Sequence, residues 1–260
     1  MKNSIVHFIG AGPGDAELIT VKGARLLGEA DVVVYAGSLV DRELVRTHAP
    51  NARVWDSAAM TLEETTRVLA DAYATGQRGV RLHTGDPAIY GAIQEQMAEL
   101  DRLGIPYAVV PGVSSAFAAA ATLKQELTLP EVTQTVILTR LAGRTPVPER
   151  EKLAEIARIG ATMVIYLSVG MIDRVVAELL QGAYTPATPV AVVAKASWPD
   201  EEVIEGTLAD IAAKVAAAGI AKQALIIVGD VLGARKHGLG AVSKLYDKGF
   251  SHGCREGSVA

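Results

Sequence analysis

Three loops rich in glycine and proline are the first candidates for chemistry, because each follows a short apolar run. They are Gly10–Asp15, Gly85–Gly91 and Pro111–Ser115. In open α/β sheets, ligands bind beyond the carboxyl ends of the strands, where glycine allows the loop backbone to approach them closely. Three such loops at one edge of a sheet could therefore line a single ligand crevice.

The first loop, Gly10-Ala11-Gly12-Pro13-Gly14-Asp15, is similar to a dinucleotide-binding fingerprint but departs from it. The fingerprint needs a third glycine where this chain has Asp15, and a carboxylate there would repel a bound pyrophosphate. We favour a loop that exposes its backbone to a ligand without phosphate. A dinucleotide site and a purely structural turn remain the alternatives.

The second and third loops each allow two interpretations. Asp86 precedes Pro87, which keeps it extended and lets its carboxylate point into the crevice. The same pair is equally typical of a helix start, with Asp as N-cap and Pro as the first helical residue. Ser114 and Ser115 could likewise bind a ligand or cap the next helix.

A basic segment opens the second half of the chain, with Arg140 followed by Gly143–Pro148. Arg140 comes directly after a predicted strand, and arginine pairs with carboxylates through two parallel hydrogen bonds, so we predict that it binds an anionic ligand. Three further basic residues alternate with glutamates and indicate a solvated helix face: Arg150, Lys152 and Arg158.

Other catalytic patterns are absent from the sequence. It has no nucleophile elbow, no phosphate-cradling G-x-x-x-x-G-K motif and no paired-carboxylate signature. The five histidines are scattered, and none stands at a zinc-ligand spacing, so we expect no metal site. A reaction that depends on positioning more than on acid–base groups would suit this chain.

The elements that must position the loops follow from alternating apolar runs and amphipathic stretches. In the first half, strands are expected at 5–9, 32–35, 53–55, 79–84 and 107–110, with helices at 18–29, 40–47, 61–75 and 89–103. This alternation predicts a parallel sheet covered by helices. The sequence Thr61-Leu62-Glu63-Glu64 predicts a capping box at the start of one helix.

The second half repeats the pattern after a mixed stretch, 123–133, which is the best candidate for a linker. Strands are expected at 135–139, 162–167, 189–194 and 224–228, with an antiparallel strand at 202–205. We therefore predict two α/β domains with mainly parallel central sheets, at 1–122 and 134–233, a tail at 234–260, and the active cleft between the domains.

Composition limits the classes of protein. With 260 residues, 50% hydrophobic and 21% charged, the chain is too apolar to be intrinsically disordered. The net charge of −4 gives no basic footprint for nucleic acid, and one cysteine excludes an internal disulfide. The longest uncharged stretch is broken by Pro106 and Pro111, and no signal peptide is evident. We expect a cytoplasmic protein that does not bind membranes.

Taken together, these motifs resemble the tetrapyrrole (uroporphyrinogen and precorrin) methyltransferase family. The resemblance rests on Val6–Asp15 with Leu18-Ile19-Thr20, on Gly85–Gly91 and on Pro111–Ser115, and it spans nearly the whole chain. Four further stretches resemble the branch that methylates C11 of precorrin-4: Tyr35–Val40, Leu138–Glu149, Ala194–Asp200 and Ser243–Asp247. A sister enzyme acting on another precorrin carbon is the first alternative, and a NAD-dependent oxidoreductase is the second.

The resemblance implies S-adenosylmethionine (SAM) as methyl donor, S-adenosylhomocysteine as product, a tetrapyrrole substrate and a homodimer that functions in cobalamin biosynthesis. The donor-binding residues that it implies are Pro13, Gly85, Asp86, Ile89, Ser114, Ser115, Leu167, Ala194 and Leu225. The loop around Pro13 would also line the substrate side. Some family members carry an aspartate after the strand tyrosine, where this chain has Ala36, so no acid–base role transfers there.

Substrate and catalytic roles are assigned as hypotheses within the same resemblance. The substrate-binding candidates are Gly12, Ser38, Arg140, Arg144 and Lys195, with the three basic residues on acetate and propionate groups. The catalytic candidates are Asp86, Tyr90 and Arg140. Asp86 would orient the methionine part of the donor.

Overall fold

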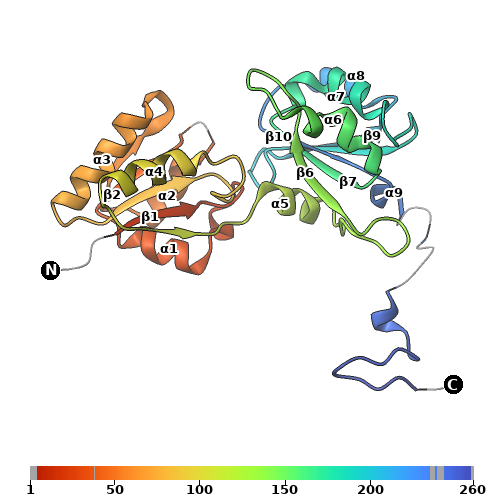
Figure 1. Cartoon of the computed structure of the whole chain (residues 1–260), viewed down its shortest axis with the longest axis horizontal. Helices are drawn as coiled ribbons and strands as arrows, with labels where there is room; N and C mark the ends of the chain where they lie inside the picture. Colours follow the sequence, from red (N-terminus) through yellow and green to blue (C-terminus); the bar gives the residue numbers. More distant parts are fainter. Residues whose placement is uncertain (1–4, 38, 235–237, 239–242, 259–260) are drawn as a thin grey trace. The chain divides into compact units, whose positions relative to one another are not determined.

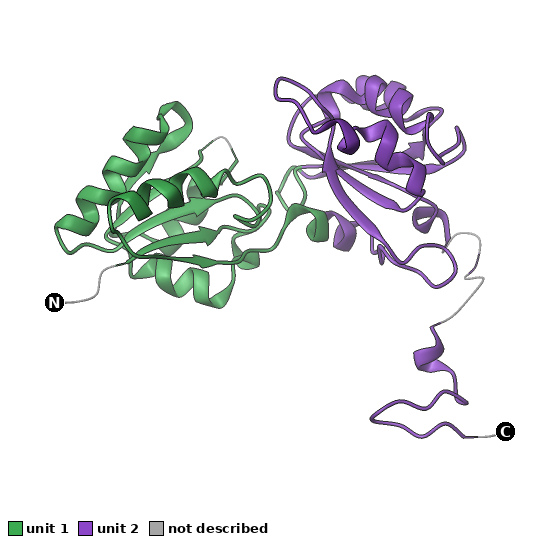
Figure 2. Cartoon of the chain, in the orientation of Figure 1, with its two compact units in different colours: residues 1–118, 195–200 green, residues 119–194, 201–260 purple. Residues whose placement is uncertain are grey.

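The computed structural model describes residues 5–37, 39–234, 238 and 243–258. Contacts divide the chain into two compact units, residues 1–118 with 195–200 and residues 119–194 with 201–260 (Figure 2). The domain limits expected from the sequence stay a prediction, which limited proteolysis around residues 123–133 would test.

The first unit is built on a five-stranded sheet in the order β3-β2-β4-β1-β5, with every neighbouring pair parallel (Figure 1). Its strands are β1 (Val6–Gly10), β2 (Val32–Tyr35), β3 (Arg53–Asp56), β4 (Gly79–His83) and β5 (Tyr107–Val110). Its helices are η1 (Ala16–Leu18), α1 (Val21–Gly28), α2 (Arg42–His48), η2 (Ser57–Ala59), α3 (Leu62–Ala74) and α4 (Ile93–Arg102). Helix α5 (Ser115–Thr122) begins in the first unit, which ends at residue 118, and continues into the second. The predicted parallel α/β architecture is confirmed.

Two separate cores form because successive side chains of a strand point to opposite faces of the sheet. On one face, Ile9 and Val33 pack with Leu27 of α1 and Leu44 of α2. On the other face, Phe8 and Val34 pack with residues of α3 and α4. Edge strand β3 is the exception, because all four of its residues are exposed.

The predicted capping box at the start of α3 is present. The Thr61 hydroxyl accepts a hydrogen bond from the Glu64 amide at 3.2 Å, and the Glu64 carboxylate accepts one from the Thr61 amide at 2.8 Å. Two backbone donors of the first helical turn are thereby satisfied, which fixes the start of the helix.

The second unit has a mixed sheet in the order β6-β7-β10-β8-β9. Its strands are β6 (Val136–Arg140), β7 (Thr162–Tyr166), β8 (Pro189–Ala194), β9 (Glu202–Thr207) and β10 (Ala224–Val228). Its helices are η3 (Glu149–Glu151), α6 (Leu153–Ile156), η4 (Ala157–Ile159), η5 (Val169–Met171), α7 (Ile172–Leu179), α8 (Ile211–Ala217), α9 (Val231–Ala234) and η6 (Lys244–Tyr246).

Strand direction in this sheet departs from the mainly parallel expectation. The β6–β7 pair is parallel, whereas β7–β10, β10–β8 and β8–β9 are antiparallel. The predicted antiparallel strand at 202–205 corresponds to β9, which reverses the chain without a crossover helix. Helix α8 then connects β9 to β10, which runs in the same direction as β9. Strand β10 lies between β7 and β8 and is antiparallel to both.

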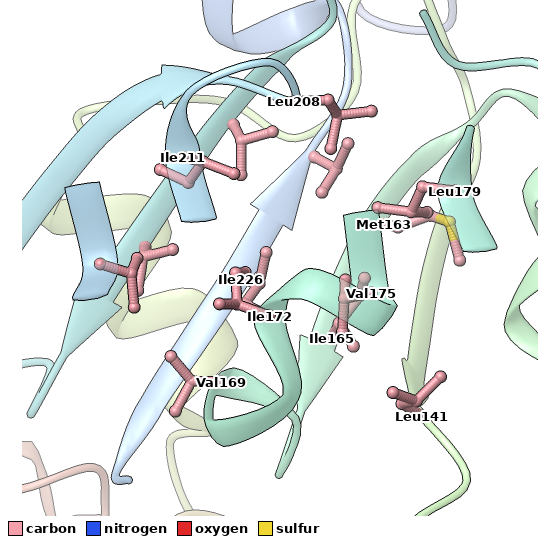
Figure 3. Packing of buried hydrophobic residues seen from close by; sticks show 14 of the residues in the cluster. Leu141, Met163, Ile165, Val169, Ile172, Val175, Leu179, Leu208, Ile211 and Ile226 are labelled. Atoms are coloured by element: carbon pink, nitrogen blue, oxygen red, sulfur yellow. The ribbon is translucent and has the colours of Figure 1, made fainter. Parts of the chain in front are cut away.

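The core of the second unit lies between this sheet and helices α7 and α8 (Figure 3). Met163 and Ile165 of β7 and Ile226 of β10 are fully buried against Val175 of α7 and Ile211 of α8. Burying each such side chain contributes about 1.5–3 kcal/mol relative to leaving it in water. The loops at the strand ends are thus connected to a closely packed layer.

The stretch predicted as a linker packs against β7. Leu127 is buried, and its carbonyl accepts a hydrogen bond from the Thr162 hydroxyl at 2.8 Å. Among the described residues, no helix combines the length and the apolar character needed to cross a membrane.

Candidate functional site

The three glycine loops meet at one edge of the first sheet, because β4, β1 and β5 are parallel neighbours. Gly12 and Gly85 exchange backbone hydrogen bonds, from Gly85 N–H to the Gly12 carbonyl at 2.7 Å and in return at 3.3 Å. A Cβ on Gly10 would lie 2.6 Å from the Gly112 Cα, and one on Gly112 would lie 2.1 Å from the Gly85 carbonyl oxygen. Glycine is therefore required where the loops touch. We call these three loops the loop cluster.

Asp86 ties the second loop to the third. One carboxylate oxygen accepts a hydrogen bond from the Gly112 amide at 2.9 Å, and the other accepts one from the Ala88 amide at 2.8 Å. The carboxylate therefore faces the neighbouring loop, and it fixes the geometry of both loops with charge-assisted hydrogen bonds.

The interpretation of Asp86 as a helix cap is wrong. Helix α4 begins at Ile93, and its N-cap is Ala92. Tyr90 and Ala92 have left-handed φ angles of 55° and 48°, which a helix running on from Pro87 would not allow. The chain instead turns tightly here, since a Cβ on Gly91 would lie 2.2 Å from the Pro87 carbonyl oxygen.

Tyr90 and Ile89 lie in this turn. Tyr90 is 47% exposed, and Ile89 is half-buried. A left-handed backbone at a residue other than glycine costs on the order of 1–3 kcal/mol and is enriched at functional sites. The turn thus presents Tyr90 from a strained backbone within the loop cluster.

Ser114 and Ser115 open helix α5. The Ser114 hydroxyl, which is buried, accepts a hydrogen bond from the Ala116 amide at 3.3 Å, as a helix cap does. Ser115 is the first residue of the helix and is half-buried. The capping interpretation is therefore confirmed for Ser114, and Ser115 stays a candidate ligand contact.

The remaining candidates of the first unit lie around the first loop. Gly12 and Pro13 are buried, and both backbone polar groups of Gly12 are used by Gly85. Lys195 forms an ion pair with Asp200, whose pKa is lowered by that hydrogen bond. The Ser38 assignment lies outside the described residues.

In the second unit, the candidates collect at one sheet edge. Arg140 is opposite Tyr166, directly before Leu167, while Ala194 is opposite Ala224, directly before Leu225. Ala194 and Leu225 are buried, so they can offer a ligand little more than backbone groups. Leu167 is 66% exposed and has a left-handed φ of 55°.

Arg140 holds the loop that follows it. Its guanidinium donates to the carbonyls of Thr145 at 3.1 Å, Pro146 at 2.7 Å and Leu141 at 3.4 Å. Since a guanidinium has five N–H donors, two remain for a ligand. Arg144 lies in the same loop, is exposed, and has no hydrogen-bond or ion-pair partner within the described part of the chain.

The neighbouring basic helix face is solvated, as expected. Its three cations pair with nearby glutamates, so that Arg150 meets Glu151, Lys152 meets Glu149, and Arg158 meets Glu155. These pairs are exposed and neutralise the face locally, so that within the described basic segment 140–158 Arg140 and Arg144 are left available to an anion.

Two buried titratable residues escaped the sequence analysis. His83, at the end of β4, is 5% exposed, and its Nε2 has no partner among the described residues. Burial, reinforced by the charge of Arg81, lowers the pKa of His83 to about 3. Burial lowers the pKa of Arg81 to about 10, while Gln96 and the Val34 carbonyl accept its hydrogen bonds. A strand interior gives no local sign of such pairing.

Trp198 and Ser197 were also missed as contact residues. Trp198 donates its indole N–H to the Pro13 carbonyl at 2.9 Å, and the Ser197 hydroxyl accepts a hydrogen bond from the Asp15 amide at 3.0 Å. These partners lie more than 180 residues apart in the chain. The only sequence signal was the similarity of 194–200 to one branch of a family, which gave these two residues no role.

A surface hollow of about 740 Å³ lies beside β3 and α3, and Trp55, Arg67 and Asp71 line it. None of the candidate residues contributes to its lining. Within the described ranges, no group of three or more His, Cys, Asp and Glu residues could hold a metal ion.

Known proteins are similar to this chain in sequence and in fold. Residues 5–212 match the family model described as Tetrapyrrole (Corrin/Porphyrin) Methylases. A cobalt-precorrin-4 C(11)-methyltransferase of Methanocaldococcus jannaschii is 56% identical over 254 residues, which are 98% of this chain and 97% of the relative. The solved structure of a cobalt precorrin-4 methyltransferase, a cobalamin biosynthetic enzyme, is 49% identical with a TM-score of 0.85, covering 87% of this chain and 95% of that chain.

A second solved structure includes a ligand. It is the uroporphyrin-III C-methyltransferase of Thermus thermophilus complexed with S-adenosylhomocysteine, 32% identical with a TM-score of 0.73. The match covers 88% of this chain and 93% of that chain.

Proposed function

Since the chain belongs to the tetrapyrrole methylase family, we propose that it transfers a methyl group from SAM to C11 of precorrin-4 or of cobalt-precorrin-4. The observation that carries this proposal is the similarity, over nearly the full length of both chains, to an enzyme named for this carbon. The loop cluster alone would suit several small ligands. We further propose that the protein is a cytoplasmic homodimer.

The residues present are compatible with SAM as the donor. SAM combines a flat apolar base with ribose hydroxyls, an ammonium and a carboxylate, so a suitable site needs apolar surface and backbone hydrogen-bonding groups. Leu167 offers exposed apolar surface on a left-handed backbone. The loop cluster offers backbone that glycine leaves uncovered. We propose that the donor contacts are Pro13, Gly85, Asp86, Ile89, Ser114, Ser115, Leu167, Ala194 and Leu225.

Catalysis by this chain is proposed to depend on positioning. When bound, SAM supplies a methyl group on a sulfonium, which is already a good leaving group. Holding two reactants in line can lower a barrier by about 7–11 kcal/mol without any acid or base. Asp86 contributes through its hydrogen bonds to the Gly112 and Ala88 amides, which keep two loops of the cluster in register. Tyr90, exposed on its strained turn, is proposed to contact the reactants.

The substrate carboxylates are proposed to bind the free cations. Arg144 has no partner within the described ranges, and Arg140 keeps two N–H donors after holding its loop. Lys195 can contribute if its ion pair with Asp200 opens. Gly12 and Ser38 complete the proposed substrate set.

A ligand-protection experiment separates this proposal from its nearest rival. Thermal unfolding is followed alone, with S-adenosylhomocysteine and with NAD, because a ligand of the native state raises the melting temperature by mass action. We expect S-adenosylhomocysteine to raise the melting temperature and NAD to leave it unchanged. Protection by NAD alone would support an oxidoreductase and contradict the proposal.

A turnover experiment then separates the reaction from that of sister enzymes. Purified protein is incubated with SAM and, in parallel, precorrin-4, cobalt-precorrin-4 and uroporphyrinogen III. We expect mass spectrometry to show one added methyl on a precorrin-4 form and none on uroporphyrinogen III. The reverse pattern would assign the chain to a sister reaction. Light scattering on the same preparation, with a mass of two chains expected, tests the dimer.

A further inference from the structure

The connection between β8 and β9 is longer than an antiparallel pair needs, since a two-residue turn can join such strands. Within it, residues 195–200 belong by their contacts to the first unit, although both flanking strands belong to the second (Figure 2). We call these six residues the 195–200 segment. Its extra length brings Trp198 and Ser197 to the Gly10–Asp15 loop.

Two hydrogen bonds join the segment to that loop. The Trp198 indole N–H donates to the Pro13 carbonyl at 2.9 Å, and the Asp15 amide donates to the Ser197 hydroxyl at 3.0 Å. Pro13 has no backbone N–H to donate, and the indole gives the carbonyl of this buried residue a hydrogen-bond partner. The two contacts hold the loop on either side of Gly14.

Gly14 lets the Trp198 ring lie directly against the loop backbone. A Cβ at this position would be 2.2 Å from the Cδ1 atom of the ring. No Cβ tolerates such a distance, so any other residue would push the ring away or shift the loop. The glycine and the tryptophan are therefore matched in shape.

The segment has a shape of its own, which costs conformational energy. Lys195 and Ser197 have left-handed φ angles of 49° and 69°, and neither is glycine. The Trp198 amide donates to the Lys195 carbonyl at 2.9 Å, and the Lys195 side chain pairs with Asp200. In this conformation the Trp198 indole reaches the Pro13 carbonyl.

We propose that Trp198 is a positioning residue, which fixes the Gly10–Asp15 loop in the conformation that binds the tetrapyrrole. The inference rests on the proposed function, in which this loop lines the substrate side. The other two loops of the cluster are fixed by Asp86 and by their glycines, without Trp198. Loss of Trp198 therefore weakens tetrapyrrole binding much more than donor binding, because Pro13 is the one proposed donor contact on this loop.

The test compares Trp198→Phe with the matched control Trp55→Phe. The first variant keeps a ring against Gly14 and removes the N–H donor, while Trp55 lies half-exposed on edge strand β3. We expect Trp198→Phe to raise the tetrapyrrole KM about fivefold, as the loss of one hydrogen bond does. The Kd of S-adenosylhomocysteine and the kcat should stay within about twofold of the control.

A spectroscopic readout follows the contact without any turnover. The chain has two tryptophans, so Trp198 is the only tryptophan left in Trp55→Phe. Adding Gly14→Ala to that background should shift the emission to the red and increase quenching by acrylamide, because the ring leaves the loop. If this double variant does not fold, Trp198→Phe still gives the kinetic result.

Each outcome separates the inference from the proposed function. If the unaltered protein methylates no tetrapyrrole, the proposed function fails. If it methylates precorrin-4 while Trp198→Phe retains the KM of the control, the positioning role is wrong. Equal weakening of the tetrapyrrole and S-adenosylhomocysteine, with a lower melting temperature, would mean that Trp198 only stabilises the fold and would also overturn the inference.

Discussion

In the first unit, most candidate polar groups already have partners within the protein, whereas in the second unit two candidates face solvent. Both carboxylate oxygens of Asp86 accept hydrogen bonds from backbone amides, and Gly12 and Ser114 also form hydrogen bonds within the protein. Leu167, by contrast, is 66% exposed, and Arg144 has no partner among the residues described. The loop cluster is thus a prebuilt scaffold, and the second unit supplies side chains that are free for a ligand.

A candidate residue can therefore contribute to a site in two ways. A residue of the scaffold acts by fixing backbone, so its loss should change both stability and affinity. A free residue acts by direct contact, so its loss should change affinity alone. If substitutions of scaffold residues and of free residues changed stability and affinity alike, this distinction would be wrong. The following predictions run from the largest expected effect to the smallest.

Gly112→Ala should have the largest effect. The new Cβ would lie 2.1 Å from the Gly85 carbonyl oxygen and 2.7 Å from the Gly10 Cα, both backbone atoms that cannot rotate away. We expect a loss of about 3 kcal/mol or more in the free energy of unfolding, measured by urea denaturation. Gly253→Ala, with no atom within 4 Å of its Cβ, is the control. Equal stability of the two variants would contradict the loop packing.

Acidification should destabilise the first unit through His83. Its pKa is about 3 in the folded protein and near 6.5 when unfolded, so the unfolded chain binds the proton more readily. The contribution of His83 to the free energy of unfolding is therefore fully present above pH 6.5. It is lost as the pH drops towards 3, by at most about 1.4 kcal/mol per pH unit. Unfolding measured at several pH values should show a shallower slope for His83→Gln. An unchanged slope would mean that the pKa of His83 is the same in the folded and the unfolded protein and would contradict the effect of burial.

Asp86→Ala should lower both stability and donor affinity. The change leaves the Gly112 and Ala88 amides without their acceptor, which costs about 1–3 kcal/mol. We expect a lower melting temperature and a weaker S-adenosylhomocysteine Kd by calorimetry, with a smaller change in tetrapyrrole KM. Asp86→Asn keeps one acceptor oxygen and should lie in between. A normal Kd in Asp86→Ala would remove Asp86 from the donor site.

Arg144→Ala and Arg140→Ala should separate direct contact from loop support. Arg144 is free and exposed, so its loss should raise the tetrapyrrole KM about tenfold, or about 1.4 kcal/mol, with the melting temperature unchanged. Arg140 also holds three carbonyls, so its loss should raise KM and lower the melting temperature. Both should bind S-adenosylhomocysteine normally, and a weaker Kd in either would contradict the substrate assignment.

Leu167→Ala should have the smallest effect on stability. The side chain is mostly exposed, so the free energy of unfolding should change by less than about 0.5 kcal/mol. Donor affinity should nevertheless fall, because an apolar contact is removed. Leu167→Gly should lose affinity equally while gaining stability, since glycine adopts a positive φ without strain. An unaltered Kd in both variants would show that Leu167 is not a donor contact.

The sequence patterns predicted the structure where the signal is local. Alternating apolar runs located the strands of both sheets, and Thr61 with Glu64 marked the start of α3. The three glycine loops were expected at one sheet edge, and they meet there. Hydrophobic periodicity and capping act over a few residues, so they can be recognised before the fold is known.

The remaining features depend on contacts between distant parts of the chain. Strand β10 is antiparallel to both of its neighbours, β7 and β8. Its apolar run, Ala224–Val228, predicts a buried strand but does not encode the direction in which it pairs. The late start of α4 depends on the turn at Tyr90 and on Asp86 bonding to Gly112. The bond between Trp198 and Pro13 joins residues whose pairing exists only in the folded protein.

The most direct test of the central claim is the position of the transferred methyl group. The protein is incubated with precorrin-4 or cobalt-precorrin-4 and SAM labelled with carbon-13 in the methyl group, and the product is examined by NMR. The account predicts one labelled methyl on C11 of the tetrapyrrole. A label on any other carbon, or no transfer to either substrate, would contradict it.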